Sequence, residues 1–405
     1  MDDNYDSENL VNTSTGKPRG KVTVSLLAEM SGVSRATVSR VLNEHESVNE
    51  EARAKVLAAI KATGYSKHRT QIKISLRFTK VTIMCDEHGS AFEGSYFDTV
   101  LRCLHEEGQR LGIQCEFIGR DQMSVPSRLS AILAGSEAII ILGSDSPEIL
   151  HLVKRFKMPT VLINGIDPSM KICTIAPDAE ISFYNIANYL MDHGHQRVAL
   201  LTAHVKHTMW ERTSGFVRAF KLRGIPFDMN RQVIDLCDIA NVADPSGQTL
   251  ELLQTRRYGT DFCAARLLPY LIDHSYFDGY SAVACICDST AMSLIRALKE
   301  RGISVPHDIS VTGYDDISLA SMMTPALTTV NPDYKNLAKA AFNNLIRIAG
   351  GSVPMIIRAN TATSIIERGS VATIRRASPS VHPKAFETPT CSHYPNDLFA
   401  LKGAK

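Results

Sequence analysis

The sequence lacks the patterns that mark membrane proteins, metal sites and several large enzyme classes. No apolar run reaches the roughly 20 residues that a membrane-spanning helix needs. The nine cysteines include no Cys-x-x-Cys pair, so we expect reduced thiols rather than zinc ligands or disulfides. A phosphate-binding glycine loop, a Gly-x-Ser-x-Gly elbow and a His-Glu-x-x-His motif are also missing. These absences argue against an enzyme and predict neither a metal site nor a cofactor.

The chain as a whole also lacks an excess of charge of one sign, because its formal net charge is only +2. This balance hides an asymmetry: residues 17–80 hold 13 Lys and Arg against 5 Asp and Glu. A basic segment of this kind is typical of a surface that binds the phosphates of nucleic acid. The first 16 residues are acidic and polar, unlike a signal peptide, so we expect the protein to stay in the cytosol, associated with the nucleoid.

Within the basic segment, residues 23–43 have the pattern of two short helices joined by a tight turn. Apolar residues recur at helical spacing on both sides of Gly32, which can adopt the positive φ that a sharp turn needs. A generic helical hairpin would share this spacing, but here a small residue, a turn glycine and a polar second helix coincide, which favours a helix-turn-helix. The second helix would expose side chains suited to phosphates and base edges, namely Ser34, Arg35, Ala36, Thr37, Ser39 and Arg40.

The rest of the chain changes pattern beyond the basic segment, where apolar strands and amphipathic helices alternate in two successive blocks. Strands that are apolar throughout predict parallel sheets covered on both faces. We therefore expect a core of two doubly wound α/β lobes that face each other across a cleft. Residues 238–257 are long and polar for a connection, which leaves a surface excursion or a lid as alternatives. The expected strands lie at 81–85, 113–118, 138–142, 160–164, 197–202, 233–237, 282–287 and 309–313, and the helices at 96–111, 127–133, 147–156, 181–193, 211–223, 258–274 and 289–301.

These patterns divide the chain into five segments. Polarity at both ends predicts disorder there, and the absence of a heptad pattern near the C-terminus argues against a coiled coil. We expect a disordered N-terminal extension at 1–20, an all-α helix-turn-helix DNA-binding domain at 21–66, a basic hinge linker at 67–79, a two-lobed effector-binding and dimerisation core at 80–372, and a flexible tail at 373–405.

Several ordered motifs resemble the lactose/galactose repressor family (LacI/GalR), and the likeness runs from about residue 21 to 370. They are VSRATVSRVLN at 33–43, DHGHQRVALL at 192–201, ERTSGF at 211–216, RALKERGISVPHDISVTGYDDI at 296–317 and TPALTTV at 324–330. The resemblance implies a homodimeric transcription factor that binds a palindromic operator in double-stranded DNA. It also implies a core similar to periplasmic sugar-binding proteins, which controls the DNA reader through a small-molecule effector.

The resemblance also implies which residues bind DNA. Arg35 and Ala36 open the recognition helix and should face base edges in the major groove, with Arg40 one turn further on. An arginine there is suited to a bidentate contact with guanine. The family's phosphate-contacting positions correspond to Thr23, Ser34, Thr37, Ser39 and Asn43.

The hinge departs from the family pattern, which usually has Pro-Asn, an alanine and a leucine wedge that enters the minor groove. The matching residues here are Lys67, His68, Gln71 and Ile74. Ile74 could still act as the wedge, because isoleucine is among the residues that unstack a base step. The alternative is a basic tether that touches only the DNA backbone, since Gln71 would crowd a close pair of hinge helices.

Five polar residues are expected at the effector site. Arg212 stands where the family keeps an effector-clamping arginine, and its guanidinium fork fits paired sugar hydroxyls or a carboxylate. Asp288 and Asp315 match acidic residues that line the cleft from the second lobe. Asp86 and Asn164 end strands of the first lobe and should face them, because open α/β sheets place ligands at the carboxyl ends of strands.

Three aromatic side chains and one substitution bear on the ligand. Trp210 and either Phe92 or Phe97 could stack on the apolar face of a sugar ring, although core packing would explain each of them equally well. The family usually has Asn-Asp where this chain has Cys287-Asp288. One hydrogen-bonding group is therefore missing, which indicates a different sugar or a ligand that is not a sugar.

We therefore predict a ligand-responsive DNA-binding regulator, acting as a repressor of a carbohydrate-utilisation operon, and no membrane partner. An enzyme is the first alternative, because two-lobed α/β chains are often enzymes. A solute-binding protein is the second, but it would need export and has no use for a basic N-terminal module. Whether the ligand releases or promotes DNA binding is left open by the sequence.

Overall fold

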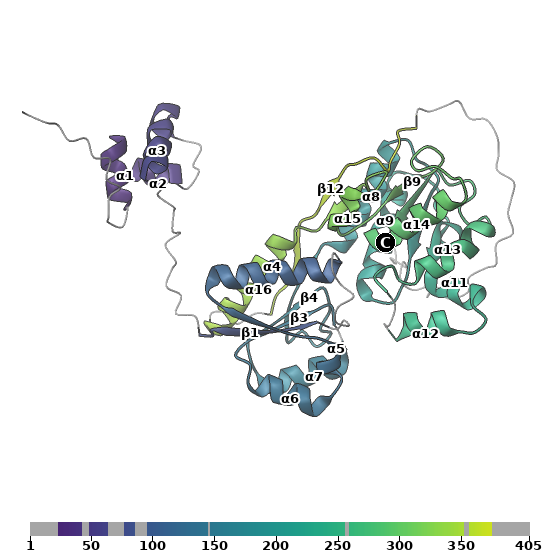
Figure 1. Cartoon of the computed structure of the whole chain (residues 1–405), viewed down its shortest axis with the longest axis horizontal. Coiled ribbons are helices and arrows are strands. Elements are labelled where there is room, and N and C mark those ends of the chain that lie inside the picture. The colour runs from purple at the N-terminus through teal and green to yellow at the C-terminus, as the bar shows by residue number, and fades with distance from the viewer. Residues whose placement is uncertain are drawn as a thin grey trace, which may run out of the picture. The chain divides into compact units, whose positions relative to one another are not determined.

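The computed structural model describes residues 23–42, 48–63, 77–85, 95–144, 146–255, 259–351 and 356–374. The chain divides into two compact units, Met1–Ser75 and Leu76–Lys405, which we describe separately (Figure 1). No helix within the described residues is long and apolar enough to cross a membrane.

The first unit contains three short helices, α1 (Val24–Ser31), α2 (Arg35–Leu42) and α3 (Glu50–Thr63). Gly32 ends α1 at a φ of 65°, and its backbone N–H donates to Ala28 and Glu29. This left-handed cap turns the chain directly into α2, as the sequence predicts. The small core consists of Leu27, Val38, Val41, Val56 and Ala59.

The second unit begins with a lobe built on a six-stranded parallel sheet. Its strands in spatial order are β11 (Arg358–Thr361), β5 (Cys173–Pro177), β4 (Thr160–Ile163), β3 (Ile139–Leu142), β1 (Lys80–Cys85) and β2 (Gln114–Ile118). One face packs against α4 (Tyr96–Leu111) and α16 (Tyr334–Ala349), which lie side by side. The other face packs against α6 (Pro126–Ala134) and α7 (Pro147–Phe156), while the short α5 (Arg120–Met123) follows β2.

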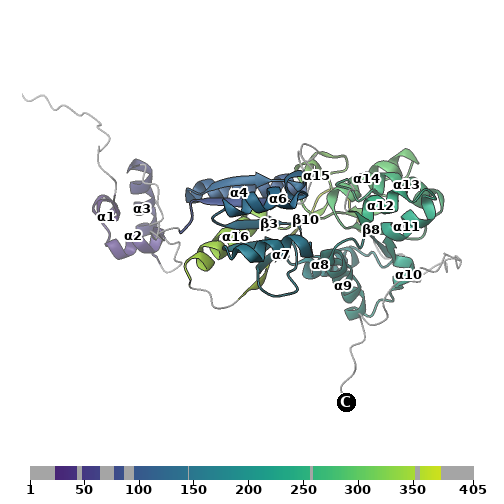
Figure 2. The same cartoon turned by 90° about the horizontal axis from the view of Figure 1, so that it is seen from below.

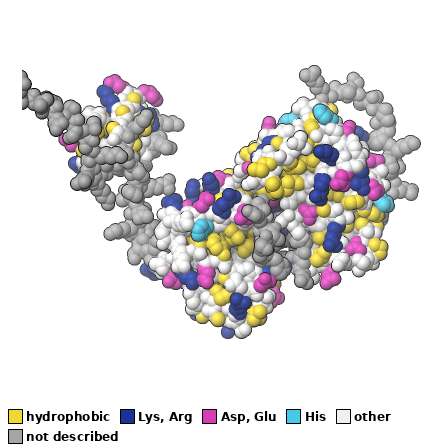
Figure 3. Space-filling view, viewed as in Figure 1, with side chains coloured by type: hydrophobic (Ala, Val, Ile, Leu, Met, Phe, Trp, Pro, Cys, Tyr) yellow, Lys and Arg dark blue, Asp and Glu magenta, His cyan; other side chains and the backbone are white. Residues whose placement is uncertain are grey.

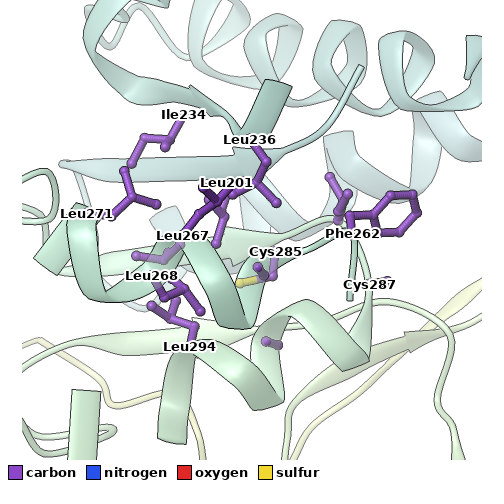
Figure 4. Packing of buried hydrophobic residues seen from close by; sticks show 14 of the residues in the cluster. Leu201, Ile234, Leu236, Phe262, Leu267, Leu268, Leu271, Cys285, Cys287 and Leu294 are labelled. Carbon is purple, nitrogen blue, oxygen red and sulfur yellow. The ribbon is translucent and has the colours of Figure 1, made fainter. Parts of the chain in front are cut away.

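The second lobe has a four-stranded parallel sheet in the order β7 (Val233–Asp235), β6 (Val198–Thr202), β8 (Ala282–Cys285) and β9 (Ser310–Thr312). Along β8, alternate side chains enter two different apolar clusters, so both faces are buried. One face is covered by α8 (Ala179–Asp192) and α9 (His207–Leu222), and α10 (Met229–Gln232) precedes β7. The other is covered by α11 (Leu236–Ala243), α12 (Gln248–Gln254), α13 (Ala264–Asp273) and α14 (Asp288–Glu300) (Figure 4).

The chain passes between the two lobes three times. It leaves the first lobe after β5, returns from β10 (Thr329–Asn331) to α16, and leaves again between β11 and β12 (Ser364–Ile366). β10 and β12 pair with each other in antiparallel fashion, and the short α15 (Ser318–Met322) precedes β10. Figure 2 shows that α7 and α16 lie in the same lobe, although they are far apart in the sequence. The lobes are therefore not two consecutive blocks, as the alternation of strands and helices had suggested.

Two further expectations need correction. The described part of the segment expected at 238–257 is neither a surface excursion nor a lid, because α11 and α12 bury Ile239, Ala240 and Leu253 in the core of the second lobe. The expected strand at 233–237 ends at Asp235, whose side chain accepts a hydrogen bond from the backbone N–H of Cys237 and begins α11. The cysteines that the structure describes are free thiols.

Candidate functional site

Helix α2 presents one polar face and one apolar face. Val38 and Val41 are buried in the small core, whereas the predicted DNA-contacting residues lie on the other side. The exposed ones are Ser34, Arg35, Ala36, Ser39 and Arg40, and Thr37 is half-buried. Within the described residues, no ion pair holds Arg35 or Arg40. Two guanidinium groups are thus available to base edges or phosphates.

Hydroxyl groups cap both helices of the motif. The Oγ1 of Thr23 accepts a hydrogen bond from the Leu26 N–H at 3.3 Å, and the Oγ of Ser34 accepts one from the Thr37 N–H at 3.1 Å. Helix N-termini attract phosphates because their N–H groups carry partial positive charge. Asn43 and Ile74 lie outside the described residues, as do Lys67, His68 and Gln71 of the hinge.

The core surface has a different charge pattern from the basic N-terminal segment. On the face of the molecule in Figure 3, acidic and basic side chains are interspersed over both lobes. This mixture is typical of a solvated surface rather than of a phosphate-binding stripe.

In the core, Arg212 lies on α9 and is 5 % exposed. Its Nη1 donates to the backbone carbonyl of Ile286, and its guanidinium lies 3.8 Å from the centre of the Tyr314 ring and 5.5 Å from that of Phe183. Among the described residues, nothing accepts a hydrogen bond from Nε. Since a buried donor without an acceptor is costly, Nε is the atom at which a ligand acceptor would be favoured.

Asp315 lies after β9, and its backbone has a φ of 115° that non-glycine residues rarely adopt. Its Oδ1 accepts a hydrogen bond from the hydroxyl of Tyr334 at 3.1 Å. Burial raises the pKa of Asp315 to about 8, Arg212 lowers it, and the nearby Asp288 raises it further. The carboxyl group therefore keeps its proton near neutral pH and can both donate and accept hydrogen bonds.

Asp288 is fully buried, and its carboxylate is occupied by its own chain. Oδ1 accepts from the hydroxyl of Thr329 at 2.5 Å, and Oδ2 accepts from the backbone N–H of Ile317 at 2.9 Å. Burial raises the pKa of Asp288 to about 6, although these two hydrogen bonds oppose the effect. The contact of Asp288 with an effector stays a prediction, and its geometry shows that it ties together two segments of the second lobe.

The first lobe contributes Asn164, whose Nδ2 donates to the hydroxyl of Tyr96 at 2.9 Å. Tyr96 packs edge-on against Phe97, with ring centres 4.9 Å apart, and against Tyr334 at 5.5 Å. The ammonium group of Lys206, from the second lobe, lies 5.6 Å from the Phe97 ring centre. Phe97 therefore lies at the junction of the lobes, whereas Asp86 and Phe92 fall outside the described residues.

Trp210 has one ring face already covered. Its indole stacks on the imidazole of His204 with ring centres 3.6 Å apart and planes 14° apart. His204 in turn lies between Asp235, 2.5 Å from Nδ1, and Thr213, 2.8 Å from Nε2. The imidazole is held from both sides, and the predicted stacking of Trp210 on a ligand stays a prediction.

The structure adds residues that the sequence analysis did not single out. Tyr96 and Tyr334 bring hydroxyl groups from the first lobe to the junction, and no motif marks either of them. Arg358 on β11 forms an ion pair with Glu211 on α9 at 2.7 Å, which joins the two lobes at their surface. The described residues contain no group of three or more His, Cys, Asp or Glu side chains that could hold a metal ion.

Comparison with known families agrees with both units. Residues 27–68 match the bacterial regulatory proteins of the lacI family. Residues 87–243 match the periplasmic binding proteins and sugar-binding domain of the LacI family, and residues 187–371 match a periplasmic-binding-protein-like domain.

Individual proteins show the same relationship. The HTH-type transcriptional repressor PurR of Vibrio vulnificus is 28 % identical over 336 residues, which cover 80 % of this chain and 91 % of that protein. The transcriptional regulator CelR in complex with cellobiose has a TM-score of 0.59 at 22 % identity, covering 86 % of this chain and 99 % of CelR. The lac repressor dimer bound to operator and the anti-inducer ONPF has a TM-score of 0.55 at 20 % identity, covering 87 % of this chain and 100 % of the lac repressor chain. The chain thus combines a helix-turn-helix region of the lacI family with a periplasmic-binding-protein-like core, and the relatives that it matches are transcriptional regulators, not enzymes.

Proposed function

We propose that this regulator is a cytosolic repressor that binds a near-palindromic operator as a homodimer and is switched by a sugar or sugar derivative between the lobes of its core. The observation that carries the effector half of the proposal is the buried guanidinium of Arg212, with its unpaired Nε, beside the carboxyl group of Asp315. An arginine fork and an adjacent carboxyl group provide donors and an acceptor for neighbouring hydroxyl groups. The regulated operon would be one for carbohydrate utilisation.

The DNA half of the proposal rests on the size and surface of the first unit. Three helices with a five-residue core form a small module, and such a module binds an operator strongly only when two copies act together. A two-fold axis in the protein then requires two half-sites related by the same axis. The relative that is a lac repressor dimer bound to operator supports this arrangement.

Coupling between ligand and operator follows from the position of the site. A ligand that contacts both Arg212 in the second lobe and Asn164 in the first binds best to one arrangement of the lobes. By linkage, that ligand and the operator must change each other's affinity by the same factor.

Ligand screening of the full-length protein tests the effector half. The chain has a single tryptophan, Trp210, two residues before Arg212 on α9, so its fluorescence reports from this site. Sugars and nucleosides should be added at millimolar concentration, with thermal unfolding as a second readout. A sugar that raises the unfolding temperature and changes the fluorescence is the expected result, and a response to nucleosides alone would contradict the sugar assignment.

Two substitutions on the same helix separate binding from folding. Arg212→Ala should abolish the response to that sugar and leave operator affinity nearly unchanged. The matched control is Arg218→Ala, because Arg218 lies at the surface of the same helix, paired with Glu180 at 2.9 Å and 5.5 Å from the centre of the Tyr184 ring. Equal loss of the sugar response and of operator binding in Arg212→Ala would contradict its role in the site.

The DNA half is tested by selecting bound duplexes from a randomised pool. The full-length protein should recover sites with two inverted half-sites, at two protomers per duplex. Recovery of asymmetric sites at one protomer per duplex would contradict the dimer.

A further inference from the structure

One hydrogen bond joins a helix of the first lobe to a loop of the second. The hydroxyl of Tyr334, at the start of α16, donates to Oδ1 of Asp315 at 3.1 Å. We propose that Tyr334 is a positioning residue of the effector site, whose hydroxyl, carried by the first lobe, holds the carboxyl group of Asp315 in the second lobe. The inference depends on the proposed function only in taking Asp315 as part of that site.

The position of the Tyr334 hydroxyl is set by the first lobe. The side chain is 6 % exposed and belongs to the apolar cluster between α4, α16 and the six-stranded sheet. Its ring meets that of Tyr96 edge-on, with centres 5.5 Å apart and planes at 69°. Asp333 caps α16 by accepting a hydrogen bond from the Asn336 N–H at 3.2 Å. These contacts leave the hydroxyl little freedom to follow Asp315 if the second lobe moves.

Asp315 is fixed by the second lobe. Its backbone N–H donates to the carbonyl of Val330 at 3.0 Å, and its φ of 115° limits where the side chain can point. Non-glycine residues keep such a conformation only when their surroundings determine it, and these cases cluster at functional sites. The distance between the hydroxyl oxygen of Tyr334 and Oδ1 of Asp315 therefore depends on how the two lobes are arranged relative to each other.

The hydrogen bond from Tyr334 affects the ionisation of Asp315, together with the charged groups around that carboxyl group. A hydroxyl that donates to a carboxylate favours its ionised form, so Tyr334 lowers the pKa of Asp315 while burial raises it. Arg212 acts in the same direction as Tyr334, but it lies in the second lobe and moves with Asp315. A change in lobe arrangement would remove the contribution of Tyr334 and keep that of Arg212.

The titratable and charged groups that face Asp315 are Arg212 from α9, Cys287 and Asp288 at the start of α14, Tyr314 beside it, Tyr96 from α4 and Tyr334 from α16.

A double-mutant cycle in the full-length protein tests the proposal without any ligand. The variants are Tyr334→Phe, Asp315→Asn and the double variant, unfolded in urea between pH 5.5 and 9.5 and followed by Trp210 fluorescence. Tyr334→Phe keeps the ring in its cluster and removes only the donor. We expect it to raise the pKa of Asp315, so that the pH at which the loss of stability levels off moves upward by roughly half to one pH unit, as the loss of one hydrogen bond implies. In the Asp315→Asn background the same substitution should leave the pH profile unchanged.

The matched control is Tyr280→Phe, because the hydroxyl of Tyr280 donates to the backbone carbonyl of Arg231 at 2.8 Å within the second lobe. It should change the shape of the pH profile in neither background. If Tyr334→Phe lowers stability equally at every pH, with or without Asp315, the hydroxyl serves packing alone and the proposal is wrong. Because no sugar is added, a failed ligand screen leaves this result unaffected, and failure of the cycle leaves the effector site standing.

Discussion

Replacing Asp315 by asparagine should change how the stability of the core depends on pH. In the unfolded chain an aspartate loses its proton near pH 3.8, whereas in the folded protein the pKa of Asp315 is raised to about 8. Between these values the folded state binds more protons than the unfolded state, so stability falls as pH rises. Asparagine has the same shape as the protonated acid and cannot ionise, so this loss should disappear in the variant.

The magnitude follows from the width of that interval. Each pKa unit corresponds to about 1.4 kcal/mol, so the step from 3.8 to about 8 corresponds to a loss on the order of 6 kcal/mol at high pH. The neighbouring Asp288 adds its own loss only up to its pKa of about 6. The comparison is therefore cleanest between pH 6 and 8, where the free energy of unfolding of the unsubstituted protein should fall by about 1 kcal/mol per pH unit relative to Asp315→Asn.

Urea unfolding followed by Trp210 fluorescence measures this difference in the core. The matched control is Asp192→Asn, because Asp192 is an exposed carboxylate that pairs with Arg223 at 2.6 Å on the surface. The control should follow the unsubstituted protein across the whole range, since exposed ion pairs contribute little to stability. Parallel pH profiles for the unsubstituted protein and Asp315→Asn would refute the reasoning.

Three further predictions concern other parts of the chain. Arg35→Ala should reduce discrimination at one operator position by about tenfold or more, as measured by binding to single-base variants, and a uniform loss of affinity on all DNA would contradict base reading. Gly215→Ala should destabilise the core by at least about 2 kcal/mol in urea unfolding, because a Cβ there would lie 1.9 Å from the carbonyl oxygen of Glu180. Glu211→Gln removes the ion pair with Arg358 and should cost less than about 1 kcal/mol in the free energy of unfolding. Because the pair joins the two lobes, the affinity for the sugar should change measurably. An unchanged affinity would show that the pair is only a surface contact.

Local patterns predicted several elements closely. The expected helices at 96–111 and 147–156 coincide with α4 and α7. Both begin after a serine whose hydroxyl caps the helix, and α7 also has a proline in its first turn. Signals of this kind lie within a few residues of the helix end and require no knowledge of distant partners.

Other elements could not be placed by local signals. β5 and β11 are short, and their membership of the first sheet depends on pairing across more than 180 residues of chain, Thr174 with Arg358 for example. β10 and β12 are only three residues long, and their pairing also joins segments that are not neighbours along the chain, Val330 with Ile365 for example. The three passages between the lobes follow from these pairings, so the expectation of two consecutive blocks was wrong.

The sequence by itself determined that this chain has a helix-turn-helix and an α/β core of parallel sheets, because hydrophobic periodicity, capping residues and the turn at Gly32 act over short distances. It also pointed to Arg212 and Asp315 through motifs along the chain. Only the tertiary structure decided that Tyr334 approaches Asp315 and that Arg358 approaches Glu211. Those contacts join residues of different lobes, and their distances depend on how long-range strand pairing and core packing return α16 and β11 to the first lobe.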